Sequence, residues 1–393
     1  MLSPFNLKSR NLSLFFTANF LGGLLFFLPV VALYMERELF TLQNVALIFS
    51  VRAVLSVLLE VPTGAIADLF GRVMTIRIAF AVFILSTLSL YVAGDMGMFM
   101  VHAFFWALGM ALESGTDNAF IYDTLKEEKR EGEYKKINGL YRVMWTSGAA
   151  VGSVFGGYMA AYSLELPILL TLIPVTISFL VTLWLKEPSY EKEDHKNIFT
   201  HMIKSSKIAL KKWNIALLSL IGFLLVGFSE VTHMMKAIFY EFNGVPLVYF
   251  GYLAAATFVL ASLGFYFSHW VSERVNERFL LAFSTLFGGV MLVCATYVGS
   301  WQLVALLMVI PAFVFGLRWP IIDDIVNRDV TSNVRATVMS LLNFSRQLGT
   351  AIMAPFLGYF ADLYSIEAAF RLSGVAVIFI ALLFLGLRAK KKA

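Results

Sequence analysis

Twelve long apolar stretches decide what this chain can fold into. Each is close to the roughly 20 residues that a helix needs to cross the hydrocarbon core of a bilayer. The chain of 393 residues is 59% hydrophobic and only 15% charged, with a mean hydropathy of +0.77, and a soluble domain cannot bury that much apolar surface. We therefore predict an all-α integral membrane protein with twelve transmembrane helices. The predicted spans are 11–34, 42–67, 73–93, 97–124, 137–161, 166–185, 213–240, 246–270, 278–299, 301–325, 335–361 and 367–388.

The distribution of basic residues predicts the orientation of these spans. With both termini in the cytoplasm, Lys and Arg recur at every inner segment and are most numerous in 186–212, whereas the outer loops hold only Arg37. This is the positive-inside pattern of a multi-pass protein of the cytoplasmic membrane. The net charge of +5 is therefore explained by topology, and we expect no nucleic-acid partner.

The sequence contains no pattern of a common enzyme. H-E-x-x-H, G-x-S-x-G and the phosphate-binding G-x-x-x-x-G-K are all absent, which argues against an intramembrane hydrolase or an ATP-driven pump. Glu230 and His233 have a spacing that suits metals in helix bundles, but such sites need a second copy and further carboxylates. We expect no metal and no cofactor. The single cysteine, Cys294, cannot form an intrachain disulfide.

The chain repeats itself at an offset of 201 residues. Gly148 matches Gly349, and Gly157-Tyr158 matches Gly358-Tyr359. Six helices in each half with the same orientation predict two pseudo-symmetric six-helix bundles, at 1–186 and 213–393. Between them, the lysine-rich residues 187–212 fit either an amphipathic helix on lipid of the inner leaflet or a solvated linker.

The stretch Gly64-x-x-x-Asp68-x-x-Gly71-Arg72 lies where one span ends and the next begins. It resembles the signature between the second and third helices of the major facilitator superfamily, a large class of secondary transporters. The resemblance implies that fold. It also implies that Asp68 caps the start of the span beginning near 333–335, and that Arg72 pairs with Asp123 in a cytoplasmic gate. In the second half Asp324 stands at the position of Asp123, with Arg274 or Arg278 as its expected partner.

A run of glycines in the fifth span resembles a motif of proton-coupled drug antiporters in the same superfamily. Glycines at such intervals flatten one helix face, so that a neighbouring helix can approach closely. The proline of that motif is replaced here by Ser153, and Leu112 stands where those antiporters carry an arginine three residues before Gly115. A general small-residue packing face is the alternative. The glycines are Gly139, Gly148, Gly152, Gly156 and Gly157.

Charged residues deep in the spans are the candidates for substrate and proton binding, because charge is costly in a bilayer. We predict Glu113 as the proton carrier and Arg346 as a substrate contact. Asp117 corresponds to Arg318 at the 201-residue offset, so these two are expected to face each other across the pathway. The alternative is that several of these charges only hold helices together. Glu230, Trp145 and Trp319 complete the candidate set.

The predicted function is secondary active transport of a small molecule by alternating access, driven by the proton gradient. Proton-coupled efflux of a lipophilic or amphipathic compound is the first hypothesis. The alternative is a symporter or facilitator for a hydrophilic metabolite such as an organic anion. A non-transporting receptor or a lipid scramblase is a third possibility. We expect a monomer whose partners are its substrate, protons and membrane lipid.

Overall fold

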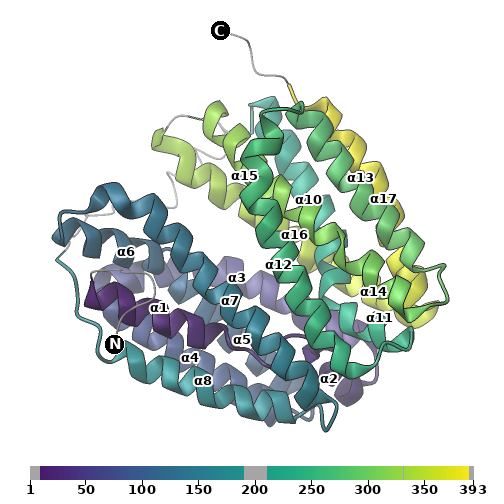
Figure 1. The fold of residues 1–393 in the computed structure, drawn as a ribbon, viewed down its shortest axis with the longest axis horizontal. Helices are drawn as coiled ribbons and strands as arrows, with labels where there is room; N and C mark the ends of the chain where they lie inside the picture. The colour runs from purple at the N-terminus through teal and green to yellow at the C-terminus, as the bar shows by residue number, and fades with distance from the viewer. Residues whose placement is uncertain (1–8, 190–209, 331, 389–393) are drawn as a thin grey trace. The chain divides into compact units, whose positions relative to one another are not determined.

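The computed structural model describes residues 9–189, 210–330 and 332–388, with the side chains of 61, 64–69, 332–334 and 336 left out. In these residues the chain forms α-helices and two short 3-10 helices joined by brief connections, with no β-strand (Figure 1). Because no water is present in the hydrocarbon to bond free backbone groups, a chain this apolar satisfies them within helices.

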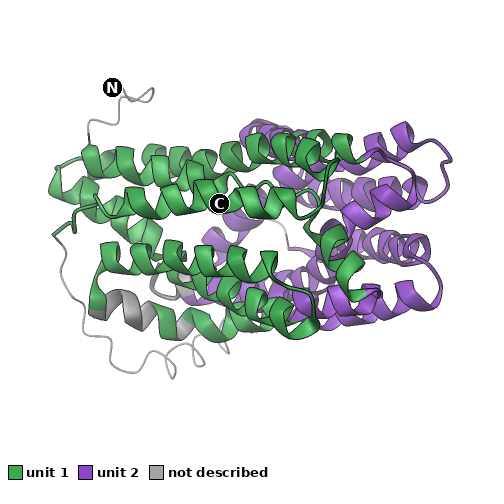
Figure 2. Ribbon diagram, turned by 90° about the horizontal axis from the view of Figure 1, so that it is seen from below, with its two compact units in different colours: residues 1–39, 51–193, 247–255 green, residues 40–50, 194–246, 256–393 purple. Residues whose placement is uncertain are grey.

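The folded chain divides into two compact units (Figure 2). Unit 1 comprises residues 1–39, 51–193 and 247–255, and unit 2 comprises residues 40–50, 194–246 and 256–393. Two helices therefore contribute residues to both units. In the helix at 42–70, residues 42–50 belong to unit 2 and the rest to unit 1. In the helix at 247–272, residues 247–255 belong to unit 1 and the rest to unit 2. The predicted bundle limits at 186 and 213 stay a prediction. Most of the predicted linker at 187–212 lies outside the described residues.

The first half of the chain forms eight α-helices and one 3-10 helix among the described residues. They are α1 (Arg10–Gly23), α2 (Val31–Leu39), α3 (Leu42–Phe70), α4 (Arg72–Tyr91), α5 (Met96–Glu113), α6 (Thr116–Glu127), η1 (Glu131–Glu133), α7 (Tyr134–Ala160) and α8 (Leu166–Thr182).

The second half follows the same order of long and broken helices. Its elements are α10 (Trp213–Met234), α11 (Lys236–Phe242), α12 (Leu247–Ser272), α13 (Glu277–Ala295), α14 (Trp301–Val309), α15 (Pro311–Asp329), α16 (Ser332–Leu363), α17 (Ile366–Leu383) and η2 (Phe384–Gly386).

Eight spans of the described chain are long and apolar enough to cross a membrane. They are α3, α4, α5 with α6, α10, α12, α13, α14 with α15, and α17 with η2. The remaining predicted spans correspond to α1 with α2, α7, α8 and α16. The all-α membrane fold predicted from hydropathy is therefore confirmed.

Four predicted spans are not continuous helices, which corrects the sequence prediction. The spans 11–34, 97–124, 213–240 and 301–325 each consist of two helices with a break between them. The break in 97–124 lies at Gly115, whose φ of +82° is costly for any residue with a Cβ. Pro311 begins α15 and lacks the N–H that a continuous helix would need. Hydropathy does not detect such breaks because both pieces remain apolar.

The glycine face of α7 packs against α1 inside unit 1. A Cβ on Gly148 or Gly156 would strike the carbonyl oxygen of Phe20 or Phe26, and one on Gly152 would lie 3.0 Å from the backbone of Leu24. Gly157 faces a different helix, the first turns of α12. Gly139 meets no described atom within 4 Å, so it does not share in this face.

This packing predicts opposite effects for two glycine-to-alanine changes in one helix. Gly156→Ala should lower the free energy of unfolding by about 1–3 kcal/mol, because the methyl group forces away the backbone of Phe26, just after α1. Gly139→Ala should be neutral or stabilising by about 0.5–1 kcal/mol, since alanine favours the helix and meets nothing there. Thermal unfolding of both variants in detergent measures the difference. Equal melting temperatures would contradict the assigned packing of the segment after α1 on α7.

Candidate transport site

The loop that resembles the superfamily signature is almost entirely helical. α3 continues through Gly64 and Asp68 to Phe70, and α4 begins at Arg72. Gly71 alone connects them, with a φ of +91°. The connection is thus a one-residue reversal, which favours glycine because of its positive φ.

Two reciprocal caps fix this reversal to the end of α8. Glu187 accepts hydrogen bonds from the backbone N–H groups of Arg72, at 2.6 Å, and Val73, at 2.8 Å. Arg77 donates to the carbonyl oxygens of residues 182, 183 and 185 at 3.0–3.3 Å. A carboxylate at a helix start and a guanidinium at a helix end both complement the helix dipole. No local pattern in the sequence marks Glu187, since its partners are more than 110 residues away.

The ion pair expected between Arg72 and Asp123 is present in unit 1. Arg72 Nε lies 3.7 Å from Asp123 Oδ2, and both side chains are largely buried. The side chain of Asp68 lies outside the described residues, so its expected capping role stays a prediction. The role of these residues as a gate is likewise a prediction.

The expected partner of Asp324 is wrong. Asp324 pairs with Arg328 at 3.3 Å, one turn along α15, and Arg328 also reaches Glu277 at 2.6 Å. Arg274 instead stacks on the ring of Trp270 at 4.1 Å. The i,i+4 spacing on one helix needs no tertiary contact, and it therefore satisfies Asp324 locally.

Glu113 ends α5 and lines a cavity in unit 1. The wall is mostly apolar and includes four aromatic rings, with Trp106 and Trp145 among them. Tyr141 donates a hydrogen bond of 3.0 Å to Glu113 Oε1. The further lining residues are Asn19, Gly22, Leu25, Phe80, Phe83, Thr87, Met110 and Val175.

Asn19 is a residue of this cavity that sequence reasoning missed. It is 3% exposed, and its side chain is hydrogen-bonded to Tyr141. Its Oδ1 atom is buried and has no hydrogen-bond partner among the described residues. An amide in an apolar helix was the available signal, because a buried polar group has to be bonded or carries a cost.

Asp117 lies on the other side of the break at Gly115 and does not line the cavity of Glu113. It occupies the first turn of α6, where Oδ1 accepts bonds from the backbone, at 2.6 Å, and the side chain, at 2.9 Å, of Asn118. Arg142 of α7 is the cation that acts on it within unit 1. The expected pairing of Asp117 with Arg318 concerns residues of different units and stays a prediction.

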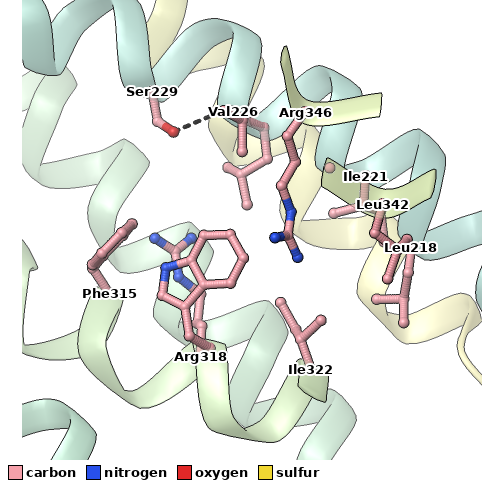
Figure 3. Close-up of a pocket in the computed structure, with 12 residues that line it drawn as sticks. Leu218, Ile221, Val226, Ser229, Phe315, Arg318, Ile322, Leu342 and Arg346 are labelled. Carbon is pink, nitrogen blue, oxygen red and sulfur yellow. Dashed lines mark hydrogen bonds between the residues drawn. The ribbon is translucent and has the colours of Figure 1, made fainter. Parts of the chain in front are cut away.

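A second cavity, in unit 2, brings together three of the predicted site residues. Arg318 and Trp319 come from α15 and Arg346 from α16, and Figure 3 shows both guanidinium groups directed into this space. The Arg346 guanidinium lies 4.1 Å from the centre of the Trp319 ring. Arg318 lies 5.4 Å from the Phe315 ring and donates to Thr285 Oγ1 at 3.1 Å. The other lining residues are Leu218, Ile221, Gly222, Leu225, Val226, Ser229, Ile322 and Leu342.

The two arginines have little negative charge around them. Neither forms an ion pair with a residue of the described chain, and Asp323 acts on Arg346 only at longer range. Planar guanidinium groups bind carboxylates in a two-point geometry and stack on aromatic rings. This cavity is therefore suited to an anion with a flat apolar part.

Glu230 lies apart from both cavities, near the break between α10 and α11. It acts electrostatically on His233 and Lys236 in the same region. Lys236 Nζ donates to the carbonyl oxygen of Met308, at 3.4 Å, near the end of α14. Lys236 thus connects the broken span of α10 and α11 with that of α14 and α15.

The comparison of the sequence with family profiles decides the family. The profile of the Major Facilitator Superfamily matches residues 12–352 and, in a second match, 234–393. The chain belongs to the Major Facilitator Superfamily. It is accordingly a multi-pass membrane transporter of the secondary type and not an enzyme.

Two curated relatives and one solved structure illustrate this membership. The cis,cis-muconate transport protein of Acinetobacter baylyi is 23% identical over 325 residues, covering 80% of this chain and 77% of that protein. The uncharacterized MFS-type transporter YxaM of Bacillus subtilis is 23% identical over 384 residues, covering 93% and 92%. A variant of the nucleoside transporter NupG has the same fold, with a TM-score of 0.84, 13% identity and coverage of 96% and 99%.

The hydrogen bonds of Glu187 at the start of α4 predict that this residue, which belongs to no sequence motif, stabilises the fold. Glu187→Gln should destabilise the protein by about 1–2 kcal/mol, because two N–H groups at the start of α4 lose a charged acceptor. Glu131→Gln, which removes an exposed carboxylate of η1, is the control and should have no effect. Thermal unfolding in detergent compares the two. A Glu187→Gln variant as stable as the control would contradict the capping role.

Proposed function

We propose that this transporter moves flat organic anions across the cytoplasmic membrane together with protons. The observation that carries this proposal is the cavity of Arg318 and Arg346 with its aromatic rings. Charge buried at membrane depth is retained in transporters where it meets a substrate, an ion or another charge. Here two positive groups share one space and no ion pair among the described residues neutralises them.

The aromatic rings define the apolar part of the proposed substrate. The faces of Trp319 and Phe315 are within stacking range of the arginines, so an anion bound there lies against π surfaces. A conjugated or aromatic carboxylate has both of these features. The cis,cis-muconate transport protein, by its name, acts on a molecule of this kind, which supports the same substrate class for this chain.

Glu113 is the proposed proton carrier. Its carboxyl group opens onto a mostly apolar cavity, one oxygen accepts a hydrogen bond from Tyr141, and α5 ends at this residue. A carboxyl group that takes up a proton becomes neutral and is then cheaper to keep in a low-dielectric space. Because an anion and a proton move in the same direction in this scheme, a more acidic outside drives uptake.

The glycine face of α7 favours a second candidate. It packs against α1 and resembles the motif of proton-coupled drug antiporters, so efflux of a lipophilic compound in exchange for protons is the alternative. The two candidates predict opposite directions of substrate movement under the same pH gradient. Symport accumulates the carboxylate inside vesicles when the outside is acidic, whereas antiport expels the substrate under the same gradient.

Arg346→Gln should weaken binding of cis,cis-muconate at least tenfold, because a hydrogen bond to a charged partner contributes about 1.5–3 kcal/mol. Arg371→Gln is the matched control. Arg371 also lies 4.2 Å from an aromatic ring, that of Tyr297, but it does not line the cavity. Titration calorimetry on purified protein measures both affinities. Unchanged binding in Arg346→Gln, or equal losses in both variants, would contradict the anion site.

Glu113→Gln should uncouple transport from protons. The variant should exchange muconate across the membrane of proteoliposomes but should not accumulate it under a pH gradient, because the amide of glutamine does not take up and release a proton near neutral pH. Asp117→Asn should still accumulate it, since Asp117 lies outside this cavity. Normal accumulation by Glu113→Gln would place the proton site elsewhere, with Glu230 as the next candidate.

A further inference from the structure

The two arginines of the cavity in unit 2 are held by different supports. Arg318 Nη1 donates a hydrogen bond of 3.1 Å to Thr285 Oγ1, on α13, and Thr285 is fully buried. Thr285 does not line the cavity, so it acts on the cavity only through the guanidinium group that it holds. A guanidinium group has five N–H donors in a planar fork. The bond to Thr285 occupies one of them and leaves others for a ligand.

Arg346 is placed by packing. A Cβ on Gly222, in α10, would lie 3.3 Å from Arg346 Cγ and 3.8 Å from its Nε, so the missing side chain makes room for the stem of the arginine. The ring of Trp319 contacts the guanidinium group at 4.1 Å. Arg346 therefore presents a cation and a flat ring together, whereas the ring beside Arg318, that of Phe315, is farther away at 5.4 Å.

These supports add no negative charge. Threonine, glycine and tryptophan are neutral, and Asp323, which acts electrostatically on Arg346, does not line the cavity. Two positive charges thus share one space without an ion pair among the described residues. A single carboxylate compensates one of them and leaves the other as a buried charge, which is costly. A ligand with two negative charges compensates both.

The rest of the wall distinguishes a dicarboxylate from a single phosphoryl group. The several oxygens of a phosphoryl group surround one atom and need donors on more than one side. Among the lining residues that the structure describes, Ser229 has the only hydroxyl, and it donates at 2.6 Å to the carbonyl oxygen of Leu225 in its own helix. Two planar carboxylates need only the two planar guanidinium groups. A conjugated chain between them then lies against the aromatic rings.

We propose that this cavity selects flat dicarboxylates, with one carboxylate bound by Arg346 beside Trp319 and the other by Arg318, which Thr285 positions. A monocarboxylate is expected at Arg346, where the closer ring also holds its flat part. Arg318 then reads the second carboxylate. Thr285 is a positioning residue, because it touches the arginine and not the ligand. This inference rests on the proposed anion site and adds to it the number of carboxylates and a separate role for each arginine.

Muconate and its monomethyl ester are the matched ligands for the test. They have the same conjugated chain, but muconate has a carboxylate at each end and the ester has only one. Titration calorimetry on the purified parent protein should show muconate binding about tenfold more tightly or better, because the second carboxylate gains charged hydrogen bonds from Arg318. Equal affinities of the two ligands would overturn the proposal.

Three variants separate the role of Arg318 from a general loss of structure. Arg318→Gln should abolish the preference for muconate and leave the affinity for the ester within about twofold of the parent. Thr285→Val keeps the size of the side chain without its hydroxyl, and should weaken only muconate, by about three- to tenfold. Thr285→Ser, which keeps the hydroxyl, should restore the parent affinities. If Thr285→Val does not fold, Arg318→Gln decides the question.

Thr296 provides the matched control for Thr285. Its Oγ1 accepts a hydrogen bond of 3.2 Å from Arg371 Nε, so it forms the same kind of pair in the same unit, but neither residue lines the cavity. Thr296→Val should leave both affinities unchanged. An equal loss of both ligands in Thr285→Val, or the same loss of muconate in Thr296→Val, would overturn the positioning role.

The same measurements distinguish a failure of this inference from a failure of the anion site. If neither ligand binds to the parent, the anion site is wrong and the inference falls with it. If both ligands bind equally and Arg346→Gln weakens both, the anion site stands and the selection of dicarboxylates is wrong. Tighter binding of phenyl phosphate than of muconate would assign both arginines to one phosphoryl group, which would also overturn the proposal.

Discussion

Hydrocarbon offers no hydrogen bonds, and this constraint shapes at least two of the helix breaks in the described chain. A helix that breaks within the membrane exposes N–H and C=O groups that another part of the chain has to meet. The backbone N–H of Phe26, in the break between α1 and α2, is bonded by Thr171 Oγ1 at 3.0 Å. Lys236 reaches the carbonyl oxygen of Met308 near the break between α14 and α15. The breaks are thus supported from neighbouring helices, which makes them defined points at which a span can bend.

The same constraint explains the placement of charge. In unit 1, Glu113 is held by Tyr141 in a mostly apolar cavity, and in unit 2, Arg318 and Arg346 lie against Thr285 and Trp319. One cavity thus presents a carboxyl group and the other presents two cations. A transporter that couples an anion to a proton needs both chemistries, and this chain keeps them in separate units.

Much of the architecture was predictable from the sequence, because hydropathy depends only on local composition. The ion pair of Arg72 and Asp123 followed from a family resemblance, and the choice of Arg318 and Arg346 as candidate residues followed from the rarity of charge in apolar spans. That these two arginines line one cavity was not predicted, since Arg318 was expected to face Asp117. The breaks at Gly115 and before Pro311 were not predicted, because hydropathy reports how apolar a segment is and carries no information on the backbone conformation. Asn19 and Glu187 were missed for another reason: the role of each depends on partners far away in the sequence, and no local pattern marks such pairs.

Proton flux is the measurement that tests the central claim most directly. Proteoliposomes with a pH-sensitive dye inside are mixed with a flat carboxylate at equal pH on both sides, with protein-free liposomes as the control for diffusion of the undissociated acid. Coupled movement of anion and proton predicts acidification of the lumen that begins with carboxylate uptake and exceeds the protein-free signal. Uptake without any change of internal pH, or with alkalinisation, would contradict the account.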